Sequence, residues 1–206
     1  MMQAMSSTLL VARAELSIEE PWRIPDGVAR VALRRATDGS APRLATTVAP
    51  YHDGQFLNVV FSGDDDGVVA THLAHDDPLW QEDVVELFLA PATSPRYFEI
   101  EVNPLGTTFD AIIDSPDGIR ATMRTDLAWT CGGLFAAVRT TPTSLDILVR
   151  IPFASLGASL SGEWRANFYR IDRHHTHGDE FTAWQPTMQT PADFHVPSAF
   201  GRLHFE

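Results

Sequence analysis

The feature that most constrains this chain is the close spacing of its turn signals. Glycine and proline clusters interrupt it at short intervals, as in PDG at 25–27, GDDDG at 63–67 and SPDG at 115–118. Between them lie short runs rich in Val, Ile, Leu, Phe and Thr, and no helical periodicity lasts for three turns. Regularly spaced short strands are typical of all-β sandwiches and barrels. We therefore expect an all-β protein with roughly ten strands.

The expected strands cover most of the chain after its first residues. They are 28–35, 44–50, 56–63, 84–90, 96–103, 106–113, 119–125, 134–140, 144–151, 164–172 and 200–205, with a short helical turn at 152–157. The 206 residues, of which 44% are hydrophobic, suffice for one domain with a substantial core. We expect a single domain over 1–206, with an irregular N-terminal segment at 1–27.

Composition excludes several classes of function. The formal net charge is −12, with 27 acidic and 15 basic residues and no basic stripe, which argues against nucleic acids and anionic membranes as partners. No apolar run has the length of a secretory h-region or of a membrane span. The default expectation is a cytoplasmic protein, or an extracytoplasmic one if a leader has been removed. The single cysteine, Cys131, forms no disulfide within the chain, and we interpret it as a small buried hydrophobe.

Alternation within three expected strands assigns their faces, because successive strand side chains point in opposite directions. In each strand an apolar face is backed by one that carries acids, amides or an arginine. The apolar sets are Val85, Leu87 and Leu89; Phe98, Ile100 and Val102; and Trp164, Ala166 and Phe168. The opposite sets include Glu86; Glu99, Glu101 and Asn103; and Arg165, Asn167 and Tyr169.

The run HDDPLWQEDVVELFLAP at 75–91 places a tryptophan in an acid-rich turn just before a strand that contains Glu86. Sugars present C–H groups on their faces, which suit a flat aromatic, and hydroxyls around their edges, which suit planar polar side chains. We interpret Trp80 as such a platform. The polar rim would comprise Glu86, Glu99, Glu101, Asn103, Arg165, Asn167 and Tyr169. Core packing of Trp80 is the alternative. Trp22, Trp129 and Trp164 are expected to pack in the core or against strands.

Four segments resemble the family 9 carbohydrate-binding modules. They are PLWQEDVVELFL, YFEIEVNPLGTTFD, WRANFYRID and FTAWQPT…DFHVPSAFGRLHF, and the similarity runs from about residue 43 to the C-terminus. The resemblance implies a two-layer antiparallel β-sandwich that holds its ligand between two tryptophans at one end. It places Trp80 and Glu86 at the family's first platform and its following glutamate.

The chain departs from that family pattern at two places. Phe194 stands where the second tryptophan is expected, with Trp184 as a nearby substitute and His195 beside it as a candidate ligand contact. Glu99 and Glu101 occupy a strand where an arginine and an amide are expected. Carboxylates crowded on one face repel one another, which raises at least one pKa unless an arginine or a cation pairs with them.

Two kinds of metal site are open from the sequence. The family carries structural calcium, and GDDDG (63–67) and HDDP (75–78) supply hard oxygen ligands, although solvated acidic turns are the favoured interpretation. The loop RIDRHHTHGDE carries His174, His175 and His177 beside Asp179 and Glu180. Zinc is one interpretation of this loop, and a solvated loop at the rim of the cleft is the favoured one.

The expected function is non-catalytic saccharide binding, in partnership with a separately encoded glycoside hydrolase. One alternative is a glycoside hydrolase that uses two of Glu86, Glu99 and Glu101. Another is a haem-binding sandwich related to dehydrogenase subunits, for which Met123 and Met188 are poor axial ligands because no paired signature accompanies them. The last alternative is a protein-interaction module that no longer binds sugars.

Overall fold

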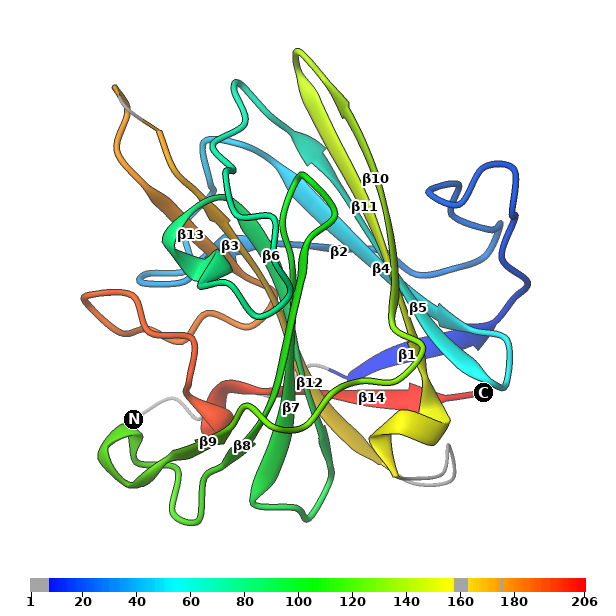
Figure 1. The fold of residues 1–206 in the computed structure, drawn as a ribbon, viewed down its shortest axis with the longest axis vertical. Coiled ribbons are helices and arrows are strands. Elements are labelled where there is room, and N and C mark those ends of the chain that lie inside the picture. The colour runs from blue at the N-terminus through cyan, green and yellow to red at the C-terminus, as the bar shows by residue number, and fades with distance from the viewer. Residues whose placement is uncertain (1–7, 158–162, 175) are drawn as a thin grey trace.

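The computed structural model describes residues 8–157, 163–174 and 176–206, and within them the chain forms fourteen strands and four short 3-10 helices (Figure 1). The strands are β1 (Thr8–Arg13), β2 (Val31–Ala32), β3 (Arg34–Arg35), β4 (Thr46–His52), β5 (Phe56–Asp64), β6 (Val84–Pro91), β7 (Arg96–Val102), β8 (Thr108–Asp114), β9 (Arg124–Asp126), β10 (Phe135–Thr141), β11 (Ser144–Pro152), β12 (Trp164–Asp172), β13 (Glu180–Ala183) and β14 (Gly201–Phe205). The 3-10 helices are η1 (Leu79–Gln81), η2 (Arg120–Thr122), η3 (Phe153–Leu156) and η4 (Pro197–Ala199). None of the described helices is long and apolar enough to cross a membrane.

The strands form two layers, as expected for a β-sandwich. The first sheet has the order β10-β11-β5-β4, and the second has the order β14-β12-β6-β7-β8-β9. β1 joins the two layers, since its first residues pair with β14 and its last two, Ala12 and Arg13, pair with β4. In the described chain these two pairings are parallel, and the remaining strand pairs are antiparallel.

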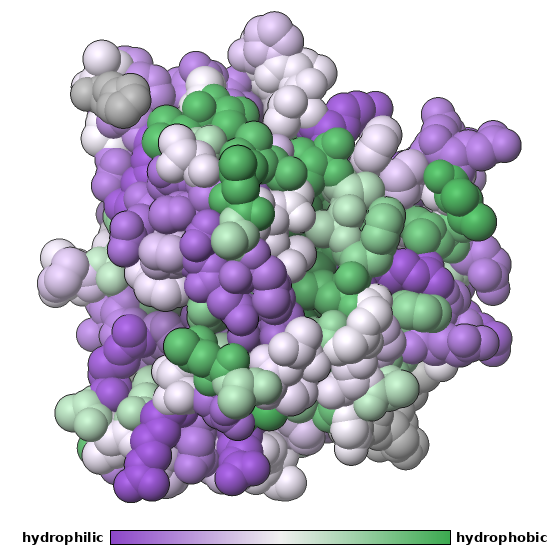
Figure 2. All heavy atoms as spheres, in the orientation of Figure 1, coloured by the Kyte–Doolittle hydropathy of each residue, from purple (hydrophilic) through white to green (hydrophobic). Residues whose placement is uncertain are grey.

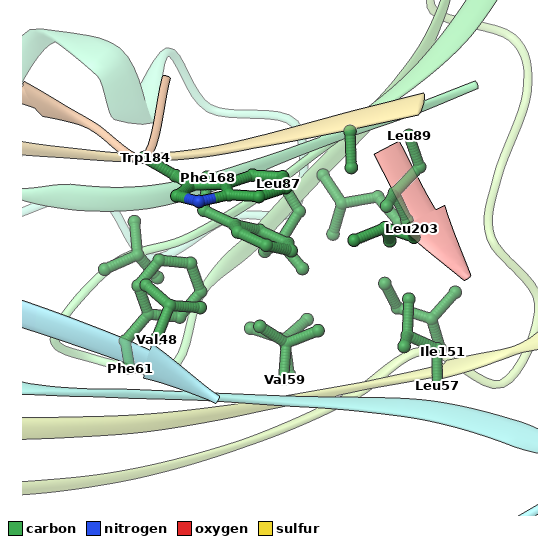
Figure 3. Packing of buried hydrophobic residues seen from close by; sticks show 14 of the residues in the cluster. Val48, Leu57, Val59, Phe61, Leu87, Leu89, Ile151, Phe168, Trp184 and Leu203 are labelled. Atoms are coloured by element: carbon green, nitrogen blue, oxygen red, sulfur yellow. The ribbon is translucent and has the colours of Figure 1, made fainter. Parts of the chain in front are cut away.

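The main hydrophobic core lies between the two sheets (Figure 3). Val48, Val59 and Phe61 of the first sheet face Leu87 and Phe168 of the second. These residues are β-branched or aromatic, or alternate with polar neighbours, which suits a strand with one buried face. The alternation of β6, β7 and β12 therefore predicted the core-facing side chains correctly.

The opposite face of the second sheet is also covered, which the sequence alone did not indicate. A second hydrophobic cluster there includes Phe88, Tyr97 and Tyr169, together with Phe194 and Phe200 from the segment that follows β13. Figure 2 shows hydrophilic side chains over much of one face of the molecule, with hydrophobic ones exposed there in several smaller groups. The face expected to carry a solvated polar rim is therefore largely buried beneath a loop.

Several segments differ from the sequence-based expectation. The expected strand at 28–35 forms only the two short strands β2 and β3. The segment 1–27 was expected to be irregular, but β1 occupies Thr8–Arg13, where Leu9 and Val11 are buried. β13 was not anticipated, because its four residues show too little alternation to stand out. The expected strand at 119–125 contains η2 at Arg120–Thr122, and β9 begins only at Arg124. The helical turn expected at 152–157 is confirmed as η3, Phe153–Leu156.

Candidate functional site

A cavity of about 530 Å³ lies against the face of the second sheet that points away from the main core. Its volume falls within the ~300–1,000 Å³ typical of small-molecule sites. Its walls are formed by Trp80, Glu86, Glu99, Phe109, Ile113, Arg120, Met123, Thr125, Leu127, Ile171, Arg173, Phe181, Ala192, Asp193, Phe194 and His195. The resemblance placed a site at one end of the sandwich. The cavity lies on the outer face of the second sheet, near the end where β6 begins and β12 finishes.

Trp80 forms part of one wall of the cavity, and contacts of its backbone and of one side of its ring fix its position. It lies in η1, whose neighbouring residue Leu79 is completely buried and anchors the turn. Trp80 is 43% exposed, and its ring forms a T-shaped contact with the Phe109 ring at a centroid distance of 5.3 Å and an angle of 79°. Arg173 Nη2 donates to the Trp80 carbonyl oxygen at 2.7 Å. The ring is thus fixed at its base while much of its surface stays accessible.

Three glutamates meet beside this wall. Glu86 on β6 is directly opposite Glu101 on β7, and Glu99 lies two residues away on the same face. Each offers a carboxylate oxygen, and these oxygens lie within 4.8 Å of one another. All three residues are buried, and Glu86 and Glu99 line the cavity while Glu101 lies behind them.

Burial and mutual repulsion keep these carboxyls protonated to unusually high pH. Burial raises the pKa of Glu99 to about 8, against an opposing effect of Arg120. Burial, followed by the Glu99 charge, raises the pKa of Glu86 well above its ordinary value. Burial, followed by the charges of Glu86 and Glu99, does the same for Glu101. A protonated carboxyl can both donate and accept hydrogen bonds, so this wall offers both functions to a ligand hydroxyl.

Glu101 is the least satisfied member of the trio. The Glu99 carboxyl and the Trp80 backbone N–H are close enough to act on its pKa in opposite directions. Yet neither oxygen of Glu101 has a partner of ordinary hydrogen-bond geometry within the described chain. A proton shared with a neighbouring carboxyl would satisfy one of these oxygens.

His195 extends the polar wall. The Tyr97 hydroxyl lies 2.6 Å from His195 Nδ1, and His195 Nε2 lies 3.5 Å from Glu99 Oε1. Burial raises the pKa of Tyr97, so this phenol stays protonated and can donate to Nδ1. The proton of a neutral His195 is then on Nε2, which faces Glu99.

Cationic and aromatic groups complete the cavity. Arg120 forms an ion pair with Asp193, with Nη1 3.6 Å from Oδ1. Arg173 forms an ion pair with Asp179, and its guanidinium lies 5.1 Å from the centroid of the Phe181 ring. The cavity therefore combines an accessible indole, protonated carboxyls and two guanidiniums, a mixture suited to a neutral polar ligand with apolar faces.

Phe194 lines the cavity, but its ring is not an open platform. It stacks on Tyr169 at a centroid distance of 4.2 Å and an angle of 14°, and it is only 7% exposed. The Tyr169 hydroxyl donates to the Phe194 carbonyl oxygen at 2.9 Å. Tyr169 thus supports the cavity from behind and does not line it.

Four of the expected site residues lie elsewhere. Trp184 stacks on Phe168 in the main core at a centroid distance of 5.5 Å (Figure 3). Asn167 is buried and bonds through its amide to the backbone of Gln185, while the Asn103 side chain closes the turn at 103–107. Arg165 donates to the carbonyl oxygens of Ser94 and Pro197. The polar side-chain atoms of Asn103, Arg165 and Asn167 hold loops, because the outer face of the second sheet is covered.

The structure adds residues that the sequence reasoning missed. Ile171, in β12, and Arg173, just beyond it, lie on the same face as Arg165, Asn167 and Tyr169. Extending the two-residue alternation of that strand past Tyr169 would have predicted both. Phe109 and Ile113 share one face of β8 in the same way. Arg120 lies in a turn whose sequence carries no comparable signal.

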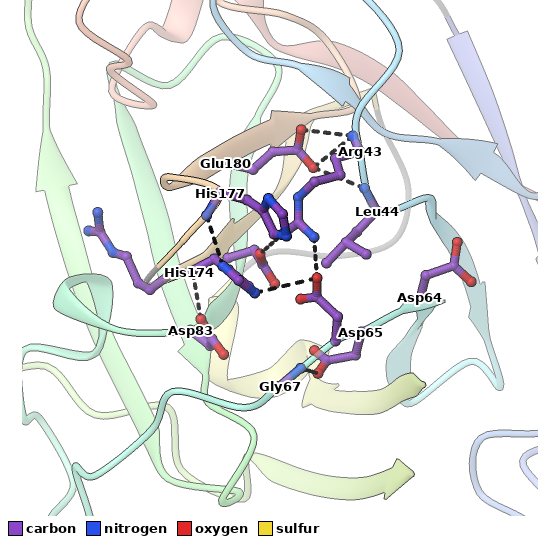
Figure 4. A network of polar contacts seen from close by, with 12 residues as sticks. Arg43, Leu44, Asp64, Asp65, Gly67, Asp83, His174, His177 and Glu180 are labelled. Carbon is purple, nitrogen blue, oxygen red and sulfur yellow. Dashed lines mark hydrogen bonds and ion pairs between the residues drawn. The ribbon is translucent and has the colours of Figure 1, made fainter. Parts of the chain in front are cut away.

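Two of the three acids of GDDDG, Asp65 and Asp66, form ion pairs with arginines. Figure 4 shows Arg43 within this network of polar contacts. Asp65 and Asp172 both accept hydrogen bonds from the buried Arg170, at 2.9 and 3.0 Å. Arg43 pairs with Asp66 and, at 2.8 Å, with Asp172. Asp65, Asp172 and Asp83 nevertheless lie close enough together to share an ion.

The histidine loop folds back on itself. His174 Nδ1 accepts hydrogen bonds from the backbone N–H groups of Thr176 and His177, and His174 Nε2 lies 3.5 Å from Asp66 Oδ2. His175 lies outside the described residues. Of the two methionines considered for haem, Met123 lines the cavity, whereas Met188 is 61% exposed and does not.

Comparison with known proteins supplies a family. The sequence model of the family described as carbohydrate-binding family 9 matches residues 38–205. No curated protein matches the chain significantly.

Solved structures share its fold. A candidate carbohydrate-binding protein from Bacteroides uniformis is 18% identical with a TM-score of 0.76, covering 98% of this chain and 100% of that one. A family 9 carbohydrate-binding module from Caldicellulosiruptor kristjanssonii in complex with cellotriose is 14% identical with a TM-score of 0.68, covering 97% and 94%. The same organism's module in complex with glucose is 13% identical with a TM-score of 0.68, covering 97% and 96%.

Proposed function

The chain belongs to carbohydrate-binding family 9, and on this premise we propose that the cavity beside Trp80 binds a saccharide without transforming it. The observation that carries the proposal is the pairing, in one cavity, of the 43% exposed Trp80 with buried carboxyl groups. The indole suits the C–H face of a pyranose, and the carboxyls and His195 suit its hydroxyls. Structural relatives in complex with glucose and cellotriose make glucose and short cello-oligosaccharides the first ligands to test. A separately encoded glycoside hydrolase as partner stays a prediction.

The test is calorimetric titration of the wild-type chain and Trp80→Ala with glucose, cellobiose, cellotriose and a wider glycan panel. We expect wild-type binding to at least one sugar and a loss of about 1–3 kcal/mol in Trp80→Ala, the range for an aromatic anchor. Phe135→Ala is a matched control, because Phe135 is 51% exposed on β10 and lies outside the cavity. Equal affinity of the wild type and Trp80→Ala would reject the platform.

Hydrolysis is the second candidate, because Glu86 and Glu99 are adjacent carboxyls with raised pKa values in the same cavity. A glycosidase needs one proton donor and one ionised carboxylate at a suitable separation across the scissile bond. Release of reducing ends from the same panel measures it. Turnover by the wild type that is abolished in Glu99→Gln would replace the binding proposal.

A further inference from the structure

His75, Asp76 and Asp110 form a cluster outside the cavity described above. His75 and Asp76 lie in the loop before η1, and Asp110 is in β8, immediately after the cavity residue Phe109. Each residue offers one ligand atom, and these atoms lie within 4.8 Å of one another. The side chain of Asp110 is 1% exposed, that of Asp76 33% and that of His75 43%, so the cluster has a buried base and an accessible side.

The imidazole of His75 is held with a lone pair toward the two acids. Its Nδ1 lies 2.9 Å from the Thr108 carbonyl oxygen and 3.1 Å from Thr108 Oγ1. The carbonyl can only accept a hydrogen bond and the hydroxyl can also accept one, so the tautomer that satisfies both contacts has its proton on Nδ1. In the neutral ring Nε2 is then unprotonated, and it faces Asp76 Oδ1 and Asp110 Oδ2. An imidazole that donates through one nitrogen to a backbone carbonyl, leaving the other for a ligand, is the usual arrangement of metal-binding histidines.

One carboxylate oxygen of Asp110 lacks a hydrogen-bond donor within the described chain. Its Oδ1 accepts the backbone N–H of Cys131 at 3.1 Å, but its buried Oδ2 receives no hydrogen bond from any residue that the structure describes. The described ion pairs likewise give neither Asp76 nor Asp110 an arginine partner. A buried carboxylate oxygen in this state is costly unless a cation or a proton satisfies it.

Asp76 is held toward the same point by its backbone. Its φ of 66° lies in the left-handed region, which is sparsely populated by residues other than glycine and which aspartate tolerates better than most. Its N–H donates to the Thr108 carbonyl oxygen at 3.2 Å, and the N–H of Asp110 points at its Oδ1 at 3.4 Å.

The distances favour an ion between these groups over a direct contact. His75 Nε2 lies 3.4 Å from Asp76 Oδ1 and 3.7 Å from Asp110 Oδ2. A protonated imidazole would bond a carboxylate at about 2.7–2.9 Å, which neither distance approaches. Ligand atoms that bind one tetrahedral zinc ion at about 2.0–2.2 Å lie roughly 3.3–3.6 Å apart, close to both values.

We propose that His75 Nε2, Asp76 Oδ1 and Asp110 Oδ2 bind a divalent transition-metal ion of the zinc class, with its remaining positions open to water. One imidazole and two carboxylates suit such an ion, whereas calcium takes an all-oxygen shell. Two carboxylates and one divalent ion also leave the buried base of the cluster without net charge. The ion would fasten the loop that carries Trp80 to β8.

The experiment is calorimetric titration of the chelator-treated chain with ZnCl₂, and separately with CaCl₂. We expect the wild type to bind a single Zn²⁺ and to unfold at a higher temperature when it is bound. His75→Ala should weaken zinc binding by more than about 100-fold, since loss of an outer-shell partner alone costs about 10–100-fold. Asp110→Asn should do the same, and because Asp110 is buried, circular dichroism must first show that this variant folds.

His174→Ala is the matched control, because His174 belongs to a separate cluster with His177 and Asp66. It should bind zinc as the wild type does. The proposal is overturned if His75→Ala keeps wild-type affinity, if only His174→Ala loses it, if the wild type binds no zinc, or if calcium binds at least as tightly at the same residues.

Discussion

At the scale of single residues, burial decides what each side chain does. Trp80 and Trp184 are the same residue type, but one is 43% exposed beside the cavity and the other is 7% exposed in the main core. Glu101 belongs to a glutamate pair that the alternation of β7 placed on one face, yet it lies beneath the cavity and does not line it. Its buried carboxyl has no ordinary partner, so ionising it opposes folding.

The glutamate trio predicts that stability falls as pH rises. The pKa of Glu99 is raised from 4.5 to about 8, so the folded state binds more protons than the unfolded state between these values. The stabilising contribution is present below pH 4.5 and is lost as the pH rises through about 8. Glu86 and Glu101 act in the same direction. Urea unfolding across this pH range measures the effect, and a profile that rises throughout would contradict it.

Replacing Glu101 by glutamine should stabilise the chain at alkaline pH, because glutamine cannot ionise and can donate to a neighbouring carboxylate. We expect a gain of about 1 kcal/mol or more at pH 8, seen as a rise of about 2–4 °C in Tm. The gain should shrink at pH 5. Glu19→Gln is the control, because Glu19 is exposed, and it should change Tm little at either pH.

At the scale of elements, β1 and the loop after β13 do most to shape the molecule. β1 is short and begins near the chain terminus, but it closes the gap between β14 and β4 and so joins the two sheets. The loop after β13 places Phe194 and His195 over the second sheet. This loop turns a sheet surface into a walled cavity.

Leu9→Ala tests the role of β1. Leu9 is 6% exposed in the main core, and leucine truncation at such sites costs about 2–5 kcal/mol. Leu10, its neighbour on the same strand, is 45% exposed, so Leu10→Ala should cost much less. Chemical denaturation measures both, and equal effects of the two substitutions would mean that β1 is not part of the core.

At the scale of the whole molecule, one arginine ties the two sheets together at one end of the core. Arg170 follows Trp164, Ala166 and Phe168 on the core-facing side of β12 and is 4% exposed. Its guanidinium donates to Thr46 Oγ1, the Asp64 carbonyl oxygen and the carboxylates of Asp65 and Asp172. The hydrophobic alternation thus ends in a buried ionic junction.

Arg170→Met should destabilise the chain by about 3–5 kcal/mol, because it leaves the buried carboxylates Asp65 and Asp172 without their shared cation. Arg30→Met is the control, since Arg30 is exposed, and it should have little effect. Urea midpoints at neutral pH measure both. A small loss in Arg170→Met would mean that Arg43 alone neutralises this junction.

The sequence by itself determined the strands with strong alternation and their faces. Leu87 and Phe168 face the main core, and Glu86, Glu99 and Glu101 share the opposite face, because side-chain direction in a strand is a local property with a period of two residues. Motif resemblance in turn indicated the family to which the chain belongs. Only the tertiary structure decided which strands are neighbours, that the polar face is covered, and that Arg120 and Arg173 join Trp80 around one cavity. These features depend on contacts between segments far apart in the chain, and local periodicity carries no information about such contacts.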